Sequence, residues 1–259
     1  MQFTDQMNRT IRLESTPKRI VSLVPSQTEL LFDLGLEKET VGITKFCVHP
    51  EKWFRNKTRV GGTKTINFEK IRELNPDLII ANKEENTESE IKALMSDFPV
   101  WMSDIQNLED ALEMIFLIGN MTNTQNTAKE IINNIQEKFA LLKPQYTKAA
   151  YLIWKNPMMS INKSRFIHDM LNRCGFENVF AATTEDYPEI SKEQLQEANP
   201  EIILLSSEPY PFKEKHVAYF QNICPKAEIK LVDGEMFSWY GSRLQTAPSY
   251  FQNLLKSIT

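Results

Sequence analysis

The sequence is poor in glycine, cysteine and histidine, and each shortage narrows the range of functions. Only 8 glycines occur among 259 residues, and no glycine-rich phosphate-binding motif follows an expected strand, which argues against nucleotide-dependent catalysis. The 3 cysteines and 3 histidines are too few and too widely spaced for a disulfide framework, a Cys-x-x-Cys zinc site or a multi-histidine metal site. The cysteines are most simply buried thiols.

An excess of positive charge and long apolar segments are also missing. The net charge is -4, and the basic residues are scattered among 34 acids, so the chain has no basic stripe and we expect no nucleic-acid partner. No apolar segment approaches the roughly 20 residues that cross a bilayer. The first residues lack the apolar core of a signal peptide, so we expect no export signal in this sequence.

What the sequence does contain is an alternation of short apolar runs and segments of helical periodicity, which predicts parallel βαβ units. Ser26 or Thr28 is expected to cap the first helix, which Gly35 ends, and Asn67 to cap a later one. Residues 107–143 carry two helices and no strand, and the second has a one-sided apolar stripe. Strands are expected at residues 19–24, 41–47, 77–82, 100–103, 149–154, 201–206 and 229–232.

This alternation predicts an α/β fold class with two Rossmann-like lobes, each a mainly parallel sheet flanked by helices. We assign residues 1–121 to an N-terminal lobe, 122–144 to one long backbone helix that joins the lobes, and 145–259 to a C-terminal lobe. At 41% hydrophobic residues the chain can bury a core of this size.

One segment of the chain is echoed in the other half. "FEKIRELNPDLIIAN" at 68–82 aligns without a gap with "KEQLQEANPEIILLS" at 192–206. The match sets Glu69 against Glu193, and each Asn-Pro pair is expected to end a helix and lead into a buried strand. We interpret the two halves as related lobes.

The order of "RIVSLVPSQTELLFDLGL", "VGIT", "INFEKIRELNPDLIIAN" and "SKEQLQEANPEIILL" resembles the helical-backbone (class III) substrate-binding proteins of ABC transporters, most closely those for cobalamin and iron siderophores. The resemblance covers nearly the whole chain. It implies a monomer that captures a metal-containing chelate in a cleft between its lobes and delivers it to a permease dimer without catalysis. It also implies a periplasmic or other extracytoplasmic location, whereas the missing export signal leaves a cytoplasmic one open.

The resemblance implies that the ligand is held by loops that follow strands, where open α/β sheets bind ligands. These loops are rich in aromatic side chains, which bury much area at little entropic cost, and they carry cations that suit anionic ligand groups. The expected ligand-binding residues are Ser26, Phe46, Cys47, His49, Lys64, Glu84, Trp154, Tyr187, Tyr210, Phe212, Phe237, Trp239, Tyr240 and Arg243.

In the resembled family a glutamate on each lobe docks into arginine pockets of the two permease subunits, and Glu69 and Glu193 match those positions. The chain departs from the cobalamin-binding proteins at Thr63, where they have a tryptophan. The ligand therefore stays open between cobalamin, a ferric siderophore and haem. No intrinsic cofactor is expected.

Direct metal binding is a separate hypothesis. Cys47 and His49 lie two residues apart on an extended segment and would share a face, so they form the one suggestive pair, although no confident metal site is predicted. His216 is expected to be solvated. The alternative function is a cytosolic, two-lobed metal-binding or chelatase-like protein that uses Cys47, His49 and Glu84 or Glu85, yet no known catalytic motif supports it.

Overall fold

The computed structural model describes residues 1–144 and 146–258. It divides into two compact units. The first unit contains residues 1–105, 109–135 and 240–243, and the second contains 106–108, 136–239 and the residues from 244 onward. The predicted lobe borders at 121 and 144 stay predictions, and residues 145 and 259, which begin and end the predicted C-terminal lobe, lie outside the described residues.

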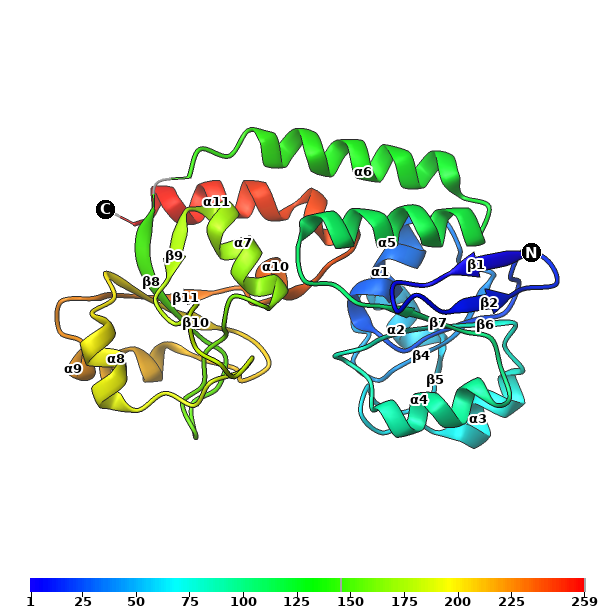
Figure 1. The fold of residues 1–259 in the computed structure, drawn as a ribbon, viewed down its shortest axis with the longest axis horizontal. Helices are drawn as coiled ribbons and strands as arrows, with labels where there is room; N and C mark the ends of the chain where they lie inside the picture. The colour runs from blue at the N-terminus through cyan, green and yellow to red at the C-terminus, as the bar shows by residue number, and fades with distance from the viewer. Residues whose placement is uncertain (145, 259) are drawn as a thin grey trace. The chain divides into compact units, whose positions relative to one another are not determined.

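The first unit is built on a five-stranded parallel sheet with the strand order β5-β4-β3-β6-β7. A separate antiparallel hairpin, β1-β2, precedes it. The helices α3 and α4 lie on one side of this sheet (Figure 1) and contribute Ile71, Ile91 and Leu94 to its apolar core. Its elements are β1 (Gln2–Thr4), β2 (Thr10–Arg12), β3 (Ile20–Ser22), α1 (Pro25–Asp33), β4 (Thr40–Ile43), α2 (Glu51–Asn56), β5 (Thr58–Arg59), α3 (Phe68–Leu74), β6 (Leu78–Asn82), α4 (Glu88–Met95) and β7 (Val100–Ser103).

The second unit is built on a four-stranded parallel sheet with the strand order β11-β10-β8-β9. Leu195 of α8 and Phe220 of α9 pack against Ile203 and Leu205 of β10. Its elements are β8 (Thr147–Leu152), α7 (Phe166–Cys174), β9 (Phe176–Asn178), α8 (Lys192–Ala198), β10 (Ile202–Ser206), η1 (Glu214–His216), α9 (Val217–Ile223), β11 (Glu228–Val232), α10 (Glu235–Ser238), η2 (Ser242–Gln245) and α11 (Ala247–Lys256).

Two helices without an intervening strand, α5 (Leu108–Met121) and α6 (Gln125–Ala140), occupy the middle of the sequence. They confirm the predicted helical region, and α6 lies within the expected backbone helix. Its predicted stripe is buried at Ala128, Ile131, Ile135 and Phe139, because residues three and four apart share one helix face. No helix in the described part of the chain is long and apolar enough to cross a membrane.

The predicted α/β class is confirmed, and one predicted cap is wrong. The helix α1 begins at Pro25, and Val24 is its N-cap without a side-chain hydrogen bond. Proline is favoured at the first helical position, since its missing N–H would be unpaired there. Thr28 therefore lies inside the helix, where its hydroxyl donates to the Val24 carbonyl at 2.9 Å.

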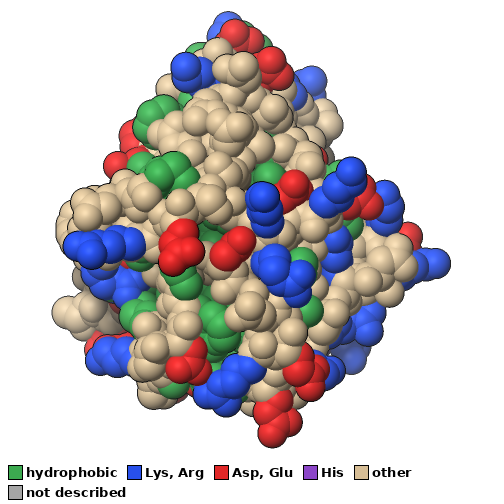
Figure 2. Space-filling view, turned by 90° about the vertical axis from the view of Figure 1, so that its right-hand side faces the viewer, with side chains coloured by type: hydrophobic (Ala, Val, Ile, Leu, Met, Phe, Trp, Pro, Cys, Tyr) green, Lys and Arg blue, Asp and Glu red, His purple; other side chains and the backbone are tan. Residues whose placement is uncertain are grey.

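Charged side chains of both signs are interspersed on the face of the molecule that Figure 2 shows. Several charged side chains form exposed ion pairs within the first unit, such as Arg72 with Asp97 at 3.1 Å and Lys83 with Asp104 at 2.6 Å. This mixture agrees with the scattered charges of the sequence.

Candidate functional site

The strand order of each sheet locates the loops where a ligand is expected. In the first unit the order reverses between β3 and β6, and in the second between β8 and β10. Connections leave the sheet in opposite directions at such a point, which opens a crevice outside the carboxyl ends of the strands. The residues that follow these four strands are therefore the candidate site of each unit.

Two aromatic rings, one exposed and one half-buried, follow the switch-point strands of the second unit. Trp154 follows β8, and 38% of its surface is exposed. Its ring meets the half-buried ring of Tyr210, which follows β10, edge to face at a centroid distance of 5.5 Å. Phe212 is buried beneath Tyr210 at 4.7 Å. Trp154 and Tyr210 thus present ring surface to solvent, whereas Phe212 supports them from the core.

The imidazole ring of His216 packs against the ring of Tyr210. Its Nδ1 accepts a hydrogen bond from the Lys213 backbone N–H at 2.9 Å, and its Nε2 lies 3.4 Å from the Tyr210 hydroxyl. Because Nδ1 is an acceptor, the neutral ring carries its proton on Nε2. Burial, followed by the charge of Lys155, lowers the pKa of His216. The expectation that this residue is solvated is wrong, since only 4% of it is exposed.

A half-buried carboxylate, Glu208, lies in the same loop as Tyr210. Its Oε1 accepts hydrogen bonds from the Ser238 hydroxyl and from the Trp239 indole N–H, the latter at 3.1 Å. Burial raises the pKa of Glu208, the hydrogen bond from Ser238 opposes the shift, and the charge of Glu235 adds to it. The sequence analysis gave this residue no role.

Two aromatic residues that the sequence predicts to bind a ligand, Phe237 and Trp239, lie in the interior of the second unit. Phe237 is fully buried and packs on Phe251 at 4.8 Å and on Tyr151 at 5.3 Å. Trp239 is 7% exposed and uses its indole N–H on Glu208. In this structure α10 turns the Phe237 side chain toward the core. Tyr187 is half-buried, and the Arg165 guanidinium lies 5.8 Å from its ring centroid.

Three residues pack together inside the first unit, two of them predicted site residues. Ser26 and Tyr240 are buried, and a Cβ atom on Gly241, the neighbour of Tyr240, would lie 2.6 Å from the Ser26 carbonyl oxygen. Burial, followed by the charges of Glu85 and Glu84, raises the pKa of Tyr240 well above its usual value. These contacts join the segment 240–243 to the start of α1.

Arg243 is already paired with a carboxylate. Its Nε donates to Glu29 Oε2 at 2.9 Å and its Nη2 to Oε1 at 2.6 Å, with 12% and 18% of the two side chains exposed. A bidentate, largely buried pair of this kind satisfies the guanidinium. The expectation that Arg243 supplies charge to a ligand therefore does not fit this arrangement.

The two residues of the suggested metal pair, Cys47 and His49, differ in burial. The Cys47 thiol is fully buried, lies 3.0 Å from the Thr28 hydroxyl and 3.1 Å from that of Thr44, and burial raises its pKa. His49, two residues on, is half-buried. Within residues 1–144 and 146–258, no three histidine, cysteine or acidic side chains gather as a metal site would require. Cys47 is therefore a packing residue.

The other predicted residues of the first unit lie on exposed loops. Phe46, after β4, is 50% exposed, and the Lys45 ammonium lies 5.1 Å from its ring centroid. Lys64 and Glu84 are exposed, and the Lys64 ammonium donates to the Glu84 carbonyl.

Two buried amides that sequence reasoning missed fix this loop. Asn82 Oδ1 accepts from the backbone N–H groups of Glu84 and Glu85 at 2.8 and 3.0 Å, and Asn86 Nδ2 donates to the Thr63 carbonyl at 3.0 Å. Their signal in the sequence is an asparagine at the end of the apolar strand β6 and a second asparagine four residues later.

The predicted docking residues occupy equivalent positions in the two units. Glu69 is the second residue of α3, capped by Asn67, and Glu193 is the second residue of α8, capped by Ser191. Both glutamates are exposed. Hydrogen bonds from its own backbone N–H and from Ser191 lower the pKa of Glu193. The two units therefore share the capped-helix geometry at this position as well as a similar amino-acid sequence.

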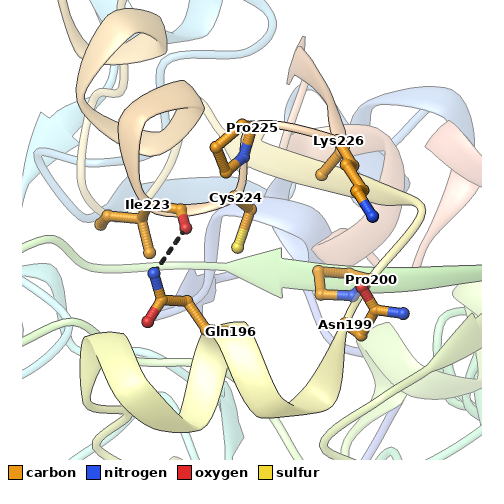
Figure 3. Close-up of a pocket in the computed structure, with 8 residues that line it drawn as sticks. Gln196, Asn199, Pro200, Ile223, Cys224, Pro225 and Lys226 are labelled. Atoms are coloured by element: carbon orange, nitrogen blue, oxygen red, sulfur yellow. Dashed lines mark hydrogen bonds between the residues drawn. The ribbon is translucent and has the colours of Figure 1, made fainter.

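A surface cavity of about 300 Å³ lies elsewhere in the second unit. Figure 3 shows it between α8 and the turn that leads into β11, with a hydrogen bond of 2.9 Å from Gln196 Nε2 to the Ile223 carbonyl. Asn199 precedes β10 and Pro225 precedes β11, so the cavity lies at the amino ends of these strands. It is therefore separate from the carboxyl-end loops. Its lining residues are Gln196, Asn199, Pro200, Ile223, Cys224, Pro225, Lys226 and Ala227.

The chain is similar in sequence and in fold to known binding proteins. It is 26% identical over 195 residues to the vitamin B12-binding protein of Vibrio parahaemolyticus, with 73% of this chain and 70% of that protein covered. Its fold is similar to that of the periplasmic vitamin B12-binding protein of Vibrio cholerae, with a TM-score of 0.77, 22% identity and 94% and 98% of the two chains covered.

A second solved structure is similar to the same extent. It is an ABC-type Fe3+-hydroxamate transport system protein from Saccharomonospora viridis, with a TM-score of 0.76, 17% identity and 98% of each chain covered. The family model described as "Periplasmic binding protein" matches residues 20–221, which is more than half of the sequence. The chain belongs to the periplasmic binding protein family.

Proposed function

We propose that this protein is the substrate-binding component of an ABC importer, which captures a metal-containing chelate and delivers it to a permease. The observation that carries the proposal is the duplicated helix and strand, with Glu69 and Glu193 at equivalent positions, in a chain that belongs to the periplasmic binding protein family. A receptor with two such units is suited to a permease of twofold symmetry.

The proposed ligand is cobalamin, a ferric siderophore or haem. Relatives named for vitamin B12 and Fe3+-hydroxamate support this class of ligand. The exposed ring of Trp154 and the half-buried ring of Tyr210 also support it, because aromatic faces bury the large apolar surfaces of such chelates with little loss of entropy. The metal enters as part of the ligand, and no intrinsic cofactor belongs to the proposal.

The proposed partner is an ABC permease dimer, which a monomeric receptor would contact through Glu69 and Glu193. Both side chains are exposed near the start of a helix. Exposed carboxylates can steer association with cationic pockets, and they do so most strongly at low salt. This role places the protein outside the cytoplasm, where a receptor meets an importer.

The proposed activity is binding without turnover. The relatives reported above are named as binding and transport proteins. The chelatase-like alternative required Cys47 beside a metal, and the full burial of that thiol among hydroxyl groups removes its support.

Tryptophan fluorescence tests the proposal directly. The exposed Trp154 is the natural reporter, because Trp53, Trp101 and Trp239 are each at most 7% exposed. Cyanocobalamin, haem and ferric siderophores are titrated into the protein, and we expect saturable quenching by at least one of them. Trp154→Phe should reduce the quenching amplitude. If none of these chelates binds, the proposed ligand class is wrong.

A further inference from the structure

The carboxylate of Glu208 lies in the same loop as Tyr210, which forms an aromatic pair with Trp154. It follows β10 at the switch point, two residues before Tyr210. The Tyr210 backbone N–H donates to the Ile153 carbonyl at 3.2 Å, which ties this loop to the residue before Trp154. A ligand that covers the two rings would therefore lie beside a carboxylate.

The surrounding residues hold this carboxylate with one oxygen outward. Oε1 accepts from Ser238 and Trp239, whereas Oε2 accepts no hydrogen bond from residues 1–144 and 146–258. Within this described part of the chain, Oε2 is not one of the polar atoms that are fully buried without a hydrogen-bond partner. Since the residue is half-buried, Oε2 is in contact with solvent and is free to accept hydrogen bonds from a ligand.

Space for the side chain depends on a glycine. A Cβ atom on Gly234 would lie 2.6 Å from Glu208 Cγ and 2.4 Å from the Ser206 hydroxyl. That hydroxyl donates to the Glu208 carbonyl at 2.6 Å and lies 3.1 Å from the Tyr151 hydroxyl. A larger residue at 234 would displace the carboxylate, so the local packing sets its position.

The charged groups that act on Glu208 are acidic, namely Glu235 and Asp233. The segments 207–212 and 233–239 contain Glu208, Asp233 and Glu235 and no lysine or arginine. Cations lie near the aromatic pair as well, since Lys155 and Lys213 both act on His216, the partner of Tyr210. Lys155 lies 5.1 Å from the Tyr219 ring centroid, and Arg165 lies 3.4 Å from Asp186. An anionic ligand group beside Glu208 would therefore meet carboxylates.

We propose that Glu208 determines ligand specificity, by accepting hydrogen bonds from a neutral or cationic metal chelate and by disfavouring polyanionic chelates. This inference rests on the proposed function and narrows its ligand class. Amide N–H groups, hydroxyl groups and ammonium groups are donors to a carboxylate, and a charge-assisted hydrogen bond is stronger than a neutral one. Anionic groups such as catecholates have like charge, and like charges at an interface weaken binding.

The test compares three probes on the full chain: neutral cyanocobalamin, a cationic ferric trihydroxamate and a polyanionic ferric tricatecholate. Dissociation constants are measured for the wild type, Glu208→Gln and Glu201→Gln. In Glu208→Gln the side-chain amide oxygen would still accept from Ser238 and Trp239, so the fold is retained. Glu201→Gln removes the same charge at the opposite end of β10, where Glu201 accepts from the Lys148 backbone N–H at 3.1 Å.

We expect the wild type to bind the neutral or the cationic probe at least about tenfold more tightly than the tricatecholate. Glu208→Gln should lower this preference about tenfold, and Glu201→Gln should leave it unchanged. A wild type that prefers the tricatecholate, or a preference that Glu208→Gln does not alter, would overturn the inference while leaving chelate binding in place. Absence of binding to all three probes would instead remove the proposed function and this inference with it.

Discussion

At the scale of single residues, the pair of Arg243 and Glu29 joins parts of the chain that are 214 positions apart. Both side chains belong to the first unit, together with Ser26 and Tyr240. The segment 240–243 therefore belongs to the first unit, although it follows all four strands of the second sheet in the sequence. The ion pair and the close approach of Gly241 to Ser26 hold it there.

Arg243→Ala should destabilise the first unit. The substitution leaves a largely buried Glu29 carboxylate without its bidentate partner, which we expect to lower the free energy of unfolding by about 2 kcal/mol. Denaturant unfolding followed by circular dichroism measures the change.

Arg55→Ala is the matched control. Arg55 pairs with Glu51 on the surface, with 71% and 72% of the two side chains exposed, so its loss should cost less than about 1 kcal/mol. Equal effects of the two substitutions would contradict a structural role for the Arg243 pair.

At the scale of elements, α3 and α8 have the same length and end in the same way. Each has seven residues and ends at an asparagine in the left-handed conformation, Asn75 with φ 43° and Asn199 with φ 43°. A proline and a fully buried strand follow each helix. Asparagine tolerates the left-handed region better than most residues, and it stops the helix where the chain must turn into the sheet.

Asn199→Ala should therefore lower the free energy of unfolding by about 1 kcal/mol, because a Cβ-bearing residue without a local hydrogen-bonding group is strained at positive φ. Asn199→Gly should cost less, since glycine adopts this conformation freely. Ser96→Ala provides the comparison, because Ser96 ends α4 in the right-handed conformation with φ −71°. Thermal unfolding of the three variants measures the order, and an alanine at 199 as stable as the glycine would contradict the explanation.

At the scale of the whole molecule, the repeat presents two exposed glutamates, Glu69 and Glu193, which are the proposed contacts with the permease. Replacing Glu69 and Glu193 together by alanine should weaken association with the cognate permease in proteoliposomes at least about tenfold, with the larger effect at low salt. Chelate binding should be unchanged, since neither side chain follows a switch-point strand.

The repeat also contains its own control. Glu73 and Glu197 are exposed and equivalent to each other on the same two helices, so their double replacement by alanine removes the same charge. Association should then stay near that of the wild type. If both double variants lose association equally, net charge rather than the two docking positions explains the effect.

The sequence by itself determined the α/β class, the two helices in the middle, and the repeated helix and strand with the asparagine cap of its first copy. These features depend on short-range causes: apolar periodicity, a capping asparagine, and a proline that ends a helix. Even here the cap of α1 was misplaced, because Ser26 and Thr28 are both good caps and only the backbone decides which residue begins the helix.

Only the tertiary structure decided which candidate site residues face solvent. Trp154 and Tyr210 follow strands and keep exposed ring surface, whereas Phe237 and Cys47, on similar segments, are buried. Glu29 as the partner of Arg243, and Ser238 as a donor to Glu208, come from segments distant in sequence. Burial and pairing of a side chain depend on which distant segments come into contact when the chain packs. The periodicity and spacing of residues along the sequence do not specify those contacts.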